Sequence, residues 1–252
     1  MHLERATWTE VADLETGLAV LPVGSTEQHG PHAAVSTDAV AARAVAETGI
    51  ERFDGDVLCA PTIAVGVSEE HRHFPGTMWV SADSFRRYVR DCVGSLAAHG
   101  FDRVVVVNGH GGNVGPLGEV TATITRHDDA YAVPFTWFDA IGDHADEMGH
   151  GGPLETSLLL ATAPELVRED RLEAAREGAA DRWGEWVSGT NLAADTVEFA
   201  ENGVVGDPSE ADPARGRALL ELAGIALADL LEAVGSRDLD GDGEEQVRSG
   251  ED

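Results

Sequence analysis

The sequence predicts a three-layer α/β/α fold with a mainly parallel central sheet. Short apolar segments alternate with longer amphipathic segments through the first half of the chain. The apolar segments are rich in β-branched residues along their whole length, as expected for strands that are buried on both faces. Strands and helices that alternate in this way are typical of α/β proteins. With 252 residues, of which 42% are hydrophobic, the chain is long enough to bury a sizeable core.

Four segments are predicted as strands, and five as helices. The strands are residues 18–23 (LAVLPV), 57–65 (VLCAPTIAV), 103–107 (RVVVV) and 131–138 (YAVPFTWF). Helical periodicity covers residues 38–48, 81–98 and 113–127 between these strands, and residues 155–162 and 212–234 after them. Thr37-Asp38 and Ser81-Ala82-Asp83 supply side chains that are typical of helix N-termini.

The chain is predicted to form one domain, residues 1–235, followed by a tail. No repeat and no Pro- or Ser-rich linker divides residues 1–235. Residues 236–252 are acidic, polar and spaced by glycines, which predicts a disordered tail. Asp238, Asp240, Asp242 and Gly243 match the opening of an EF-hand calcium loop, but Ser249 stands where that loop needs a bidentate Glu. A solvated acidic tail is therefore the better interpretation.

The charge of the chain is strongly negative. It has 46 Asp and Glu residues against 17 basic residues, a formal net charge of -29, and no Lys. Such a surface repels phosphate backbones and anionic lipids, so binding to nucleic acid or to membranes is disfavoured. The charge could mark a face that binds a cationic partner, or it could be the surface of a halophilic protein that works in molar salt. The acidic residues are scattered rather than clustered, which favours adaptation to salt.

The two cysteines and the N-terminus indicate a cytoplasmic protein. Cys59 and Cys92 both lie in apolar segments, which favours buried free thiols over a disulfide or a cysteine metal site. The N-terminal segment lacks the basic and apolar regions of a signal peptide. No apolar run approaches the ~18 residues of a membrane span.

Histidines and carboxylates gather where the predicted strands end. The carboxyl ends of parallel strands form the crevice in which α/β proteins bind ligands. The clusters comprise Glu27 and His29 with Asp38, then His110 in VNGHGGN, then His150 and Glu155 in HGGPLETS. Imidazole mixed with carboxylate suits zinc, manganese or iron(II) better than magnesium or calcium. A glycine turn with one histidine is often structural, but three such clusters together favour a metal site.

These clusters resemble the signatures of the creatininase family. The string PVGSTEQHGPH followed by TD is similar to the first signature, VNGHGGN to the second and HGGPLETSLLL to the third. Weaker similarities lie at Glu70-His71 with FPGT, and at GVVGDP from Gly203. The resemblance extends from Val20 to Leu231. It implies an α/β/α fold, two divalent metal ions per chain, hydrolysis of a non-peptide amide C–N bond and a homohexamer.

The resemblance also implies roles for individual residues. Glu27 and His110 would hold one ion and His29 the other, while Asp38 would bridge the two ions. His150 matches the catalytic histidine of the family.

The chain departs from the pattern of creatininase at two places. Creatininase proper has a Glu at the position of Gly112 that completes the second metal site, and Glu155 is the candidate to replace it, with a role in both metal binding and catalysis. The third signature also lacks the aromatic residues that enclose the substrate ring of creatininase, and Trp137 is the candidate to replace those.

The predicted reaction is hydrolysis of an amide by a metal-activated hydroxide, with His150 as the proton shuttle. Three substrate classes remain open. They are creatinine, a modified peptide end such as that cut by mycofactocin-processing relatives, and, slightly preferred, the formamide of a formylamino-pyrimidine nucleotide in flavin or deazaflavin biosynthesis. The nucleotide would need a phosphate site, for which the helix N-terminus at Gly112-Asn113 and Arg72, Arg86 and Arg87 are candidates.

The alternative is a non-catalytic regulatory protein that binds metal or a nucleotide on the same fold. Gly112 supports it, whereas the otherwise complete set of histidines and carboxylates favours an enzyme.

Overall fold

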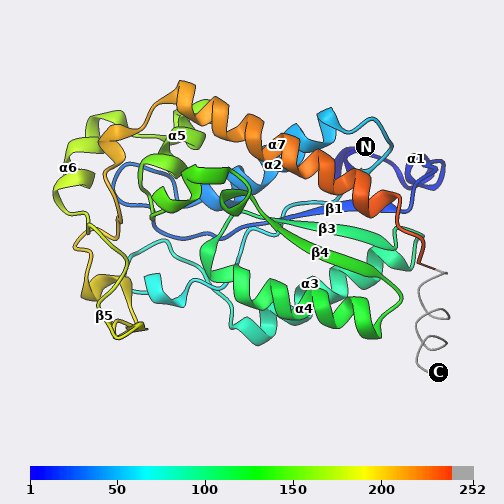
Figure 1. Cartoon of the computed structure of the whole chain (residues 1–252), viewed down its shortest axis with the longest axis horizontal. Helices are drawn as coiled ribbons and strands as arrows, with labels where there is room; N and C mark the ends of the chain where they lie inside the picture. The colour runs from blue at the N-terminus through cyan, green and yellow to red at the C-terminus, as the bar shows by residue number, and fades with distance from the viewer. Residues whose placement is uncertain (240–252) are drawn as a thin grey trace, which may run out of the picture.

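The chain is built around a four-stranded parallel sheet with the strand order β2-β1-β3-β4 (Figure 1). The computed structural model describes residues 1–239. The strands of the sheet are β1 (Leu18–Val23), β2 (Leu58–Cys59), β3 (Arg103–Asn108) and β4 (Tyr131–Thr136). Three of the four predicted strands match closely, which confirms the predicted sheet.

Strand β2 is much shorter than the predicted segment 57–65. It pairs with β1 through Leu58 and Cys59 only, and Pro61 follows shortly after. Proline has no N–H to donate to a ladder, so regular pairing stops before it. The outer edge of β2 is covered by the start of the chain, where the Cys59 amide donates to the Met1 carbonyl oxygen at 2.8 Å.

Helices cover both faces of the sheet. The helices of the described residues are α1 (Trp8–Ala12), α2 (Thr37–Arg52), α3 (Ala82–Ala97), α4 (Val114–His127), α5 (Pro153–Thr162), α6 (Leu172–Glu177) and α7 (Pro213–Gly235), and all but α1 and α6 lie on a face of the sheet. In Figure 1, α2, α5 and α7 lie above the sheet, and α3 and α4 lie below it. The three-layer α/β/α prediction is therefore confirmed.

Side chains that alternate along the strands build two separate cores. Val105 and Val107 point towards α2, α5 and α7, and pack against residues such as Val45 and Leu158. Val104 and Val106 point to the opposite face, where α3 and α4 supply a second core that includes Phe85, Val89, Leu117 and Ile124. Because both faces of β1 and β3 are covered, these strands carry apolar residues at almost every position.

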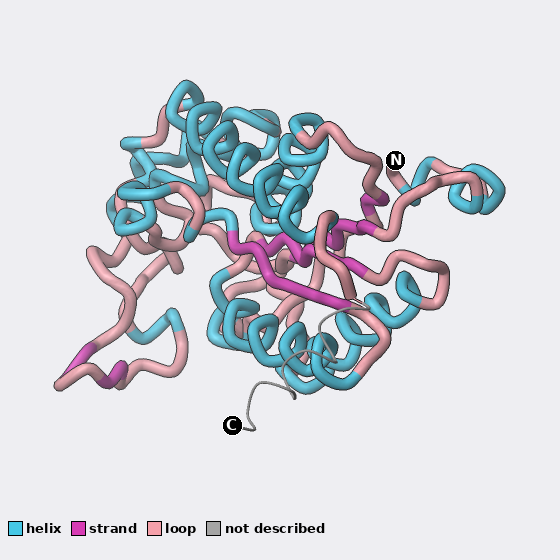
Figure 2. Tube along the Cα trace, turned by 45° about the vertical axis from the view of Figure 1, so that its right-hand side comes forward, coloured by secondary structure: helices cyan, strands magenta, loops and turns pink. Residues whose placement is uncertain are grey.

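The sequence did not predict the short elements. Helices α1 and α6, together with the hairpin β5 (Trp186–Val187) and β6 (Thr190–Asn191), lie in segments without clear periodicity. Figure 2 shows this hairpin projecting from the body of the molecule. The remaining turns are 3-10 helices at Leu3–Arg5, Glu69–His71, Gly111–Asn113, Trp137–Asp139, Gly142–Glu147, Pro164–Leu166, Glu169–Arg171, Thr196–Glu198 and Pro208–Glu210.

Several smaller predictions concern the C-terminal tail, the two cysteines and membrane spans. Helix α7 ends at Gly235, and most of the predicted tail, with Asp240, Asp242, Gly243 and Ser249, lies outside the described residues. Cys59 is buried and Cys92 is half-buried, and both thiols are free. Within residues 1–239, no helix is long and apolar enough to cross a membrane.

Candidate metal centre

The loops that follow all four parallel strands meet at the carboxyl edge of the sheet. The loop after β1 carries Glu27 and His29, and the loop after β2 carries His71. The loop after β3 carries His110, and the long connection after β4 leads to His150. All five side chains are buried, with at most 4% of their surface exposed.

Asp38 joins this group because helix α2 begins very close to the strand loops. It lies in the first turn of α2 and is 1% exposed. A Cβ at Gly24 would lie 2.5 Å from the Ala39 amide nitrogen, and one at Gly109 would lie 2.2 Å from the Asp38 carbonyl oxygen. Only glycine allows this approach, so these two glycines bring the start of α2 to the edge of the sheet.

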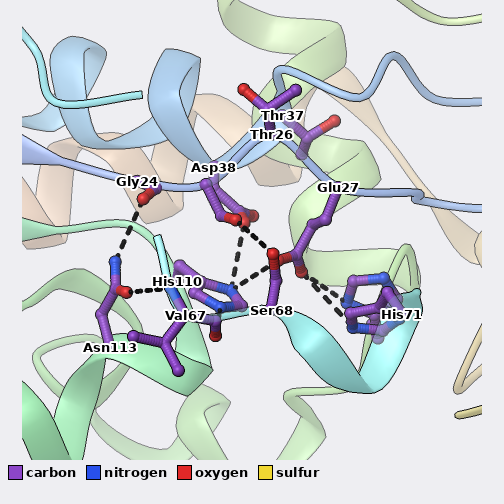
Figure 3. Close-up of polar contacts among 12 residues, drawn as sticks. Gly24, Thr26, Glu27, Thr37, Asp38, Val67, Ser68, His71, His110 and Asn113 are labelled. Carbon is purple, nitrogen blue, oxygen red and sulfur yellow. Dashed lines mark hydrogen bonds and ion pairs between the residues drawn. The ribbon is translucent and has the colours of Figure 1, made fainter. Parts of the chain in front are cut away.

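The two carboxylate oxygens of Asp38 face two different imidazoles. Asp38 Oδ1 lies 3.0 Å from His29 Nε2, and Asp38 Oδ2 lies 3.2 Å from His110 Nδ1. The same His110 nitrogen is 3.2 Å from Glu27 Oε2 (Figure 3). Candidate ligand atoms of Glu27, Asp38 and His110 all lie within 4.8 Å of one another, so they could hold one ion.

A second group of candidate ligands forms on the other side of Asp38. It comprises His29, His150 and Glu155, whose ligand atoms also lie within 4.8 Å of one another. Glu155 Oε2 is 3.7 Å from His29 Nε2. The same oxygen accepts a hydrogen bond of 2.6 Å from the Gly151 amide, so Glu155 also caps the start of α5.

Each of these three histidines is oriented by a backbone carbonyl behind it. The distances are 3.2 Å from His29 Nδ1 to the Glu27 oxygen, 2.7 Å from His110 Nε2 to the Val67 oxygen, and 2.5 Å from His150 Nε2 to the Gln28 oxygen. A carbonyl only accepts, so each outer nitrogen carries a proton, and in the neutral ring the inner nitrogen then presents a lone pair to the centre. Metal-binding histidines commonly have this arrangement.

Several buried atoms at this centre have no hydrogen-bond partner. They are both carboxylate oxygens of Glu27, His29 Nε2, Asp38 Oδ2 and His71 Nε2. Buried polar atoms are nearly always paired, because an unpaired one loses its hydration without compensation. The lone pairs of Glu27, His29 and Asp38, which converge without partners, fit divalent ions of the zinc, manganese or iron(II) class.

The charges of the centre shift the pKa values of its groups in opposite directions. Burial lowers the pKa of His29, but the Asp38 and Glu155 carboxylates outweigh it and raise this pKa well above its usual value. Burial raises the pKa of Asp38, but His29 and His110 outweigh it and lower this pKa. For His150, burial and the charge of His29 lower the pKa to about 4. Perturbed pKa values of this kind cluster at functional sites.

A cavity of about 410 Å³ opens onto the centre. Its lining combines polar groups of the centre with Glu70, Phe138, Met148 and Trp183. The Trp183 ring lies edge-on to both His71 and His150, with centroid distances of 6.0 and 5.7 Å. Its volume is in the range of small-molecule sites.

Trp137 does not have the predicted place in the cavity. It is fully buried in the core beside α2, α5 and α7, and its ring packs edge-on to Phe138. The β-strand ends at Thr136, and the 3-10 turn that follows directs Trp137 inward. Phe138 and Trp183 supply the aromatic surface instead. No periodicity or motif around Trp183 predicts its place there.

Gly112 fits the space around it closely. A Cβ there would lie 2.1 Å from the Val67 carbonyl oxygen and 2.6 Å from His110 Nε2. The backbone around position 112 therefore leaves no room for the carboxylate that creatininase proper carries.

A parallel α/β sheet with a buried set of paired imidazoles and carboxylates at its carboxyl edge defines a protein with a candidate two-metal centre. The family model for creatininase, creatinine amidohydrolase, matches residues 4–231. The chain therefore belongs to the creatininase family of amidohydrolases, which are carbon–nitrogen hydrolases.

The chain is similar to members with different named activities. It is 36% identical over 204 residues to the mycofactocin precursor peptide peptidase of Mycolicibacterium smegmatis, covering 79% of this chain and 78% of that protein. It is 31% identical over 192 residues to the creatinine amidohydrolase of Pseudomonas putida, covering 66% and 73%. A solved structure of manganese creatininase superposes with a TM-score of 0.78 at 26% identity, covering 94% of this chain and 99% of that one.

Proposed function

We propose that the protein is an amidohydrolase that uses two divalent ions bridged by Asp38. The proposal rests mainly on the two oxygens of Asp38, which face His29 Nε2 and His110 Nδ1 at 3.0 and 3.2 Å. Glu27 would complete the site of His110, and Glu155 the site of His29. Each ion would then have three protein ligands, as in catalytic metal sites that leave a position open.

The side chains of the centre divide the chemistry between them. When bound, the ions supply Lewis acidity, which lowers the pKa of water and polarises the amide carbonyl. His150 presents the lone pair of Nδ1 to the cavity, because its Nε2 proton is engaged by the Gln28 oxygen. His150 can therefore take a proton at Nδ1 and return it to the leaving nitrogen. Phe138 and Trp183 limit the access of water.

The charge of the cavity argues against a nucleotide substrate. Among the described residues that line it, three are glutamates and none is Arg or Lys. Arg72 is engaged by Asp195 at 2.6 Å, and Arg86 by Glu119 at 2.9 Å, and neither lines the cavity. Glu27 and Glu155 would be ligands of the ions, but Glu70 belongs to no group of ligands, and no Arg or Lys of the described lining would balance a phosphate beside it. The formylamino-pyrimidine nucleotide is therefore the weakest of the three candidates.

The first candidate substrate is a peptide end, and the second is creatinine. The relatives named mycofactocin precursor peptide peptidase share 36–37% identity with this chain, against 31% for the creatinine amidohydrolase. The aromatic rings of Phe138 and Trp183 favour creatinine, since they offer flat surfaces to a flat ring.

The test is a comparison of three substrates on protein that has been stripped of metal and reloaded with zinc, manganese or iron(II). We expect hydrolysis of a peptide or of creatinine that requires metal, with two ions bound per chain. Asp38→Asn should lose both ions and all turnover. Two bound ions without hydrolysis of any of the three amides would instead favour the regulatory alternative.

A further inference from the structure

His71 is a buried histidine beside the centre that the metal assignment does not use. It comes from the loop after β2, and its ring stacks on that of His150 with a centroid distance of 4.2 Å. Its Nε2 atom is 3.5 Å from Glu27 Oε1 and has no hydrogen-bond partner. Figure 3 shows the His71 ring beside the Glu27 carboxylate, and His71 lines the cavity, so a hydrogen bond from Nε2 is available there.

The side chain of Gln28 decides which nitrogen of His71 carries the proton. Gln28 Oε1 accepts from the Gly30 amide at 2.9 Å, and Gln28 Nε2 donates to the Gly203 oxygen at 2.9 Å. These two backbone contacts fix the orientation of the amide. The second N–H of Gln28 then points at His71 Nδ1, 2.9 Å away.

A donor that faces Nδ1 requires Nδ1 to accept. The proton of the neutral His71 ring must then be on Nε2, the atom that faces the cavity. The Thr196 hydroxyl, 3.1 Å from the same Nδ1, can also donate and is compatible with this tautomer. His71 is thus the reverse of His29, His110 and His150, each of which presents a lone pair.

The tautomer of His71 decides whether a third group of candidate ligands could hold a metal ion. Ligand atoms of Glu27, His71 and His150 also lie within 4.8 Å of one another. A metal ion would need a lone pair from His71 Nε2, which is already protonated. The group is instead a donor, His71 Nε2–H, next to an acceptor, His150 Nδ1, which is 3.6 Å from the shared Glu27 oxygen.

We propose that His71 is a catalytic hydrogen-bond donor and not a metal ligand. Its Nε2–H binds the oxygen of the substrate amide as that oxygen gains negative charge, while His150 handles the proton. A donor that is already oriented and buried stabilises developing charge without reorganisation. The role in turnover rests on the amidohydrolase function proposed above, whereas the tautomer does not.

The tautomer is tested first, by ¹⁵N NMR of the histidine side chains in the zinc-loaded wild-type protein. We expect His71 to show a protonated Nε2 and an unprotonated Nδ1. In the cadmium-loaded protein, ¹¹³Cd coupling should reach His29 and His110 but not His71. A proton on Nδ1, or cadmium coupling to His71, would overturn the proposal even if no variant folds.

Two substitutions test the role in turnover. His71→Gln keeps an N–H near the place of Nε2, whereas His71→Leu fills the space without a donor. Both variants should keep two ions per chain. We expect His71→Leu to lower kcat about a hundredfold with little change in KM, as for the loss of an oxyanion donor, and His71→Gln to keep most of the activity.

Loss of an ion in either variant, or equal activity of His71→Leu and His71→Gln, would contradict the donor role. If the wild type hydrolyses no amide, the proposed function fails and the role in turnover falls with it. The NMR measurement still decides the tautomer in that case, so the two failures remain distinguishable.

Discussion

Glu155 has two contacts that imply different roles. Its Oε2 atom caps the Gly151 amide at 2.6 Å and also lies 3.7 Å from His29 Nε2. A cap contributes about 1 kcal/mol to stability, and its loss leaves the ions in place. If Glu155 is instead a metal ligand, its loss should both weaken the binding of an ion and lower turnover.

We predict that Glu155→Gln loses about one ion per chain and lowers turnover at least about a hundredfold. Elemental analysis and an amide assay measure the two effects. The matched control is Glu70→Gln, since Glu70 lines the same cavity but belongs to none of the three groups of ligands. Two retained ions and nearly intact turnover in Glu155→Gln would leave Glu155 as a cap only.

Gly112 lies too close to the Val67 backbone to accept a side chain, which leads to a second prediction. We expect Gly112→Ala to lower the free energy of unfolding by about 1–3 kcal/mol, because the new Cβ meets the backbone oxygen of Val67. It should also weaken metal binding, because it crowds His110 Nε2 and its hydrogen bond to that oxygen. The control is Gly111→Ala, where a Cβ meets nothing within 4 Å. Urea unfolding with equal losses in both variants would contradict this account.

The residues of the centre that the sequence could predict are those in motifs at strand ends. The structure brings Glu27, His29, Asp38, His110, His150 and Glu155 together as the spacing and the resemblance suggested, while their roles stay predictions. His71 stands in the sequence only as a weak similarity to the family, and its loop follows a strand of two residues, which offers little signal of a strand end. Trp183 comes from an irregular segment far along the chain, which no local pattern places beside His150.

At the scale of elements, α5 and α7 pack unusually closely. A Cβ at Gly216 in α7 would lie 1.8 Å from the Ser157 carbonyl oxygen in α5. This contact supports the first turns of α5, and Glu155 is in the first of them. Close packing of these helices therefore helps to hold one side of the centre in place.

We predict opposite effects for two glycine substitutions within helices. Gly216→Ala should cost about 1–3 kcal/mol of stability, because neither helix backbone can move aside easily. Gly118→Ala in α4 should gain about 0.5–1 kcal/mol, since a Cβ there meets nothing within 4 Å and alanine favours a helix. Urea unfolding measures both. A loss in Gly118→Ala as large as that in Gly216→Ala would refute the packing argument.

Elements with strong periodicity were predictable, and short ones were not. The apolar runs of β1, β3 and β4 and the amphipathic stretches of α3 and α4 carry their own signal. Strand β2 ends early because of Pro61, and the hairpin of β5 and β6 has only two residues in each strand. Such elements depend on contacts with distant parts of the chain.

At the scale of the whole molecule, the charge of -29 is the dominant feature. Exposed ion pairs such as Arg43 with Glu47 and Arg90 with Asp128 add little to stability, because water and salt screen them. Repulsion among the many unpaired carboxylates acts over the whole surface. Added salt should therefore weaken the repulsion among the carboxylates more than it weakens the attraction within the ion pairs.

We predict that the protein melts at a higher temperature in molar KCl than in dilute buffer. The Debye length falls from about 30 Å at 0.01 M to about 3 Å at 1 M salt, which removes most of the long-range repulsion. A sucrose series is the control for preferential exclusion, which also stabilises folded proteins but does not screen charge. Equal melting temperatures at both salt concentrations would count against adaptation to salt.

The hexamer implied by the family resemblance remains a prediction. Light scattering in molar salt should give a mass about six times the 26.6 kDa of one chain. A monomeric mass under those conditions would contradict it.

The three buried carboxylates of the centre also set its electrostatic balance. Glu27, Asp38 and Glu155 carry a formal charge of -3, and two divalent ions would bring +4, which leaves +1. A buried centre with net charge attracts whatever neutralises it, because charge is poorly solvated away from water. The centre should therefore admit one small monovalent anion together with its metals. Azide or fluoride should consequently compete with the substrate, whereas a small cation of similar size should not.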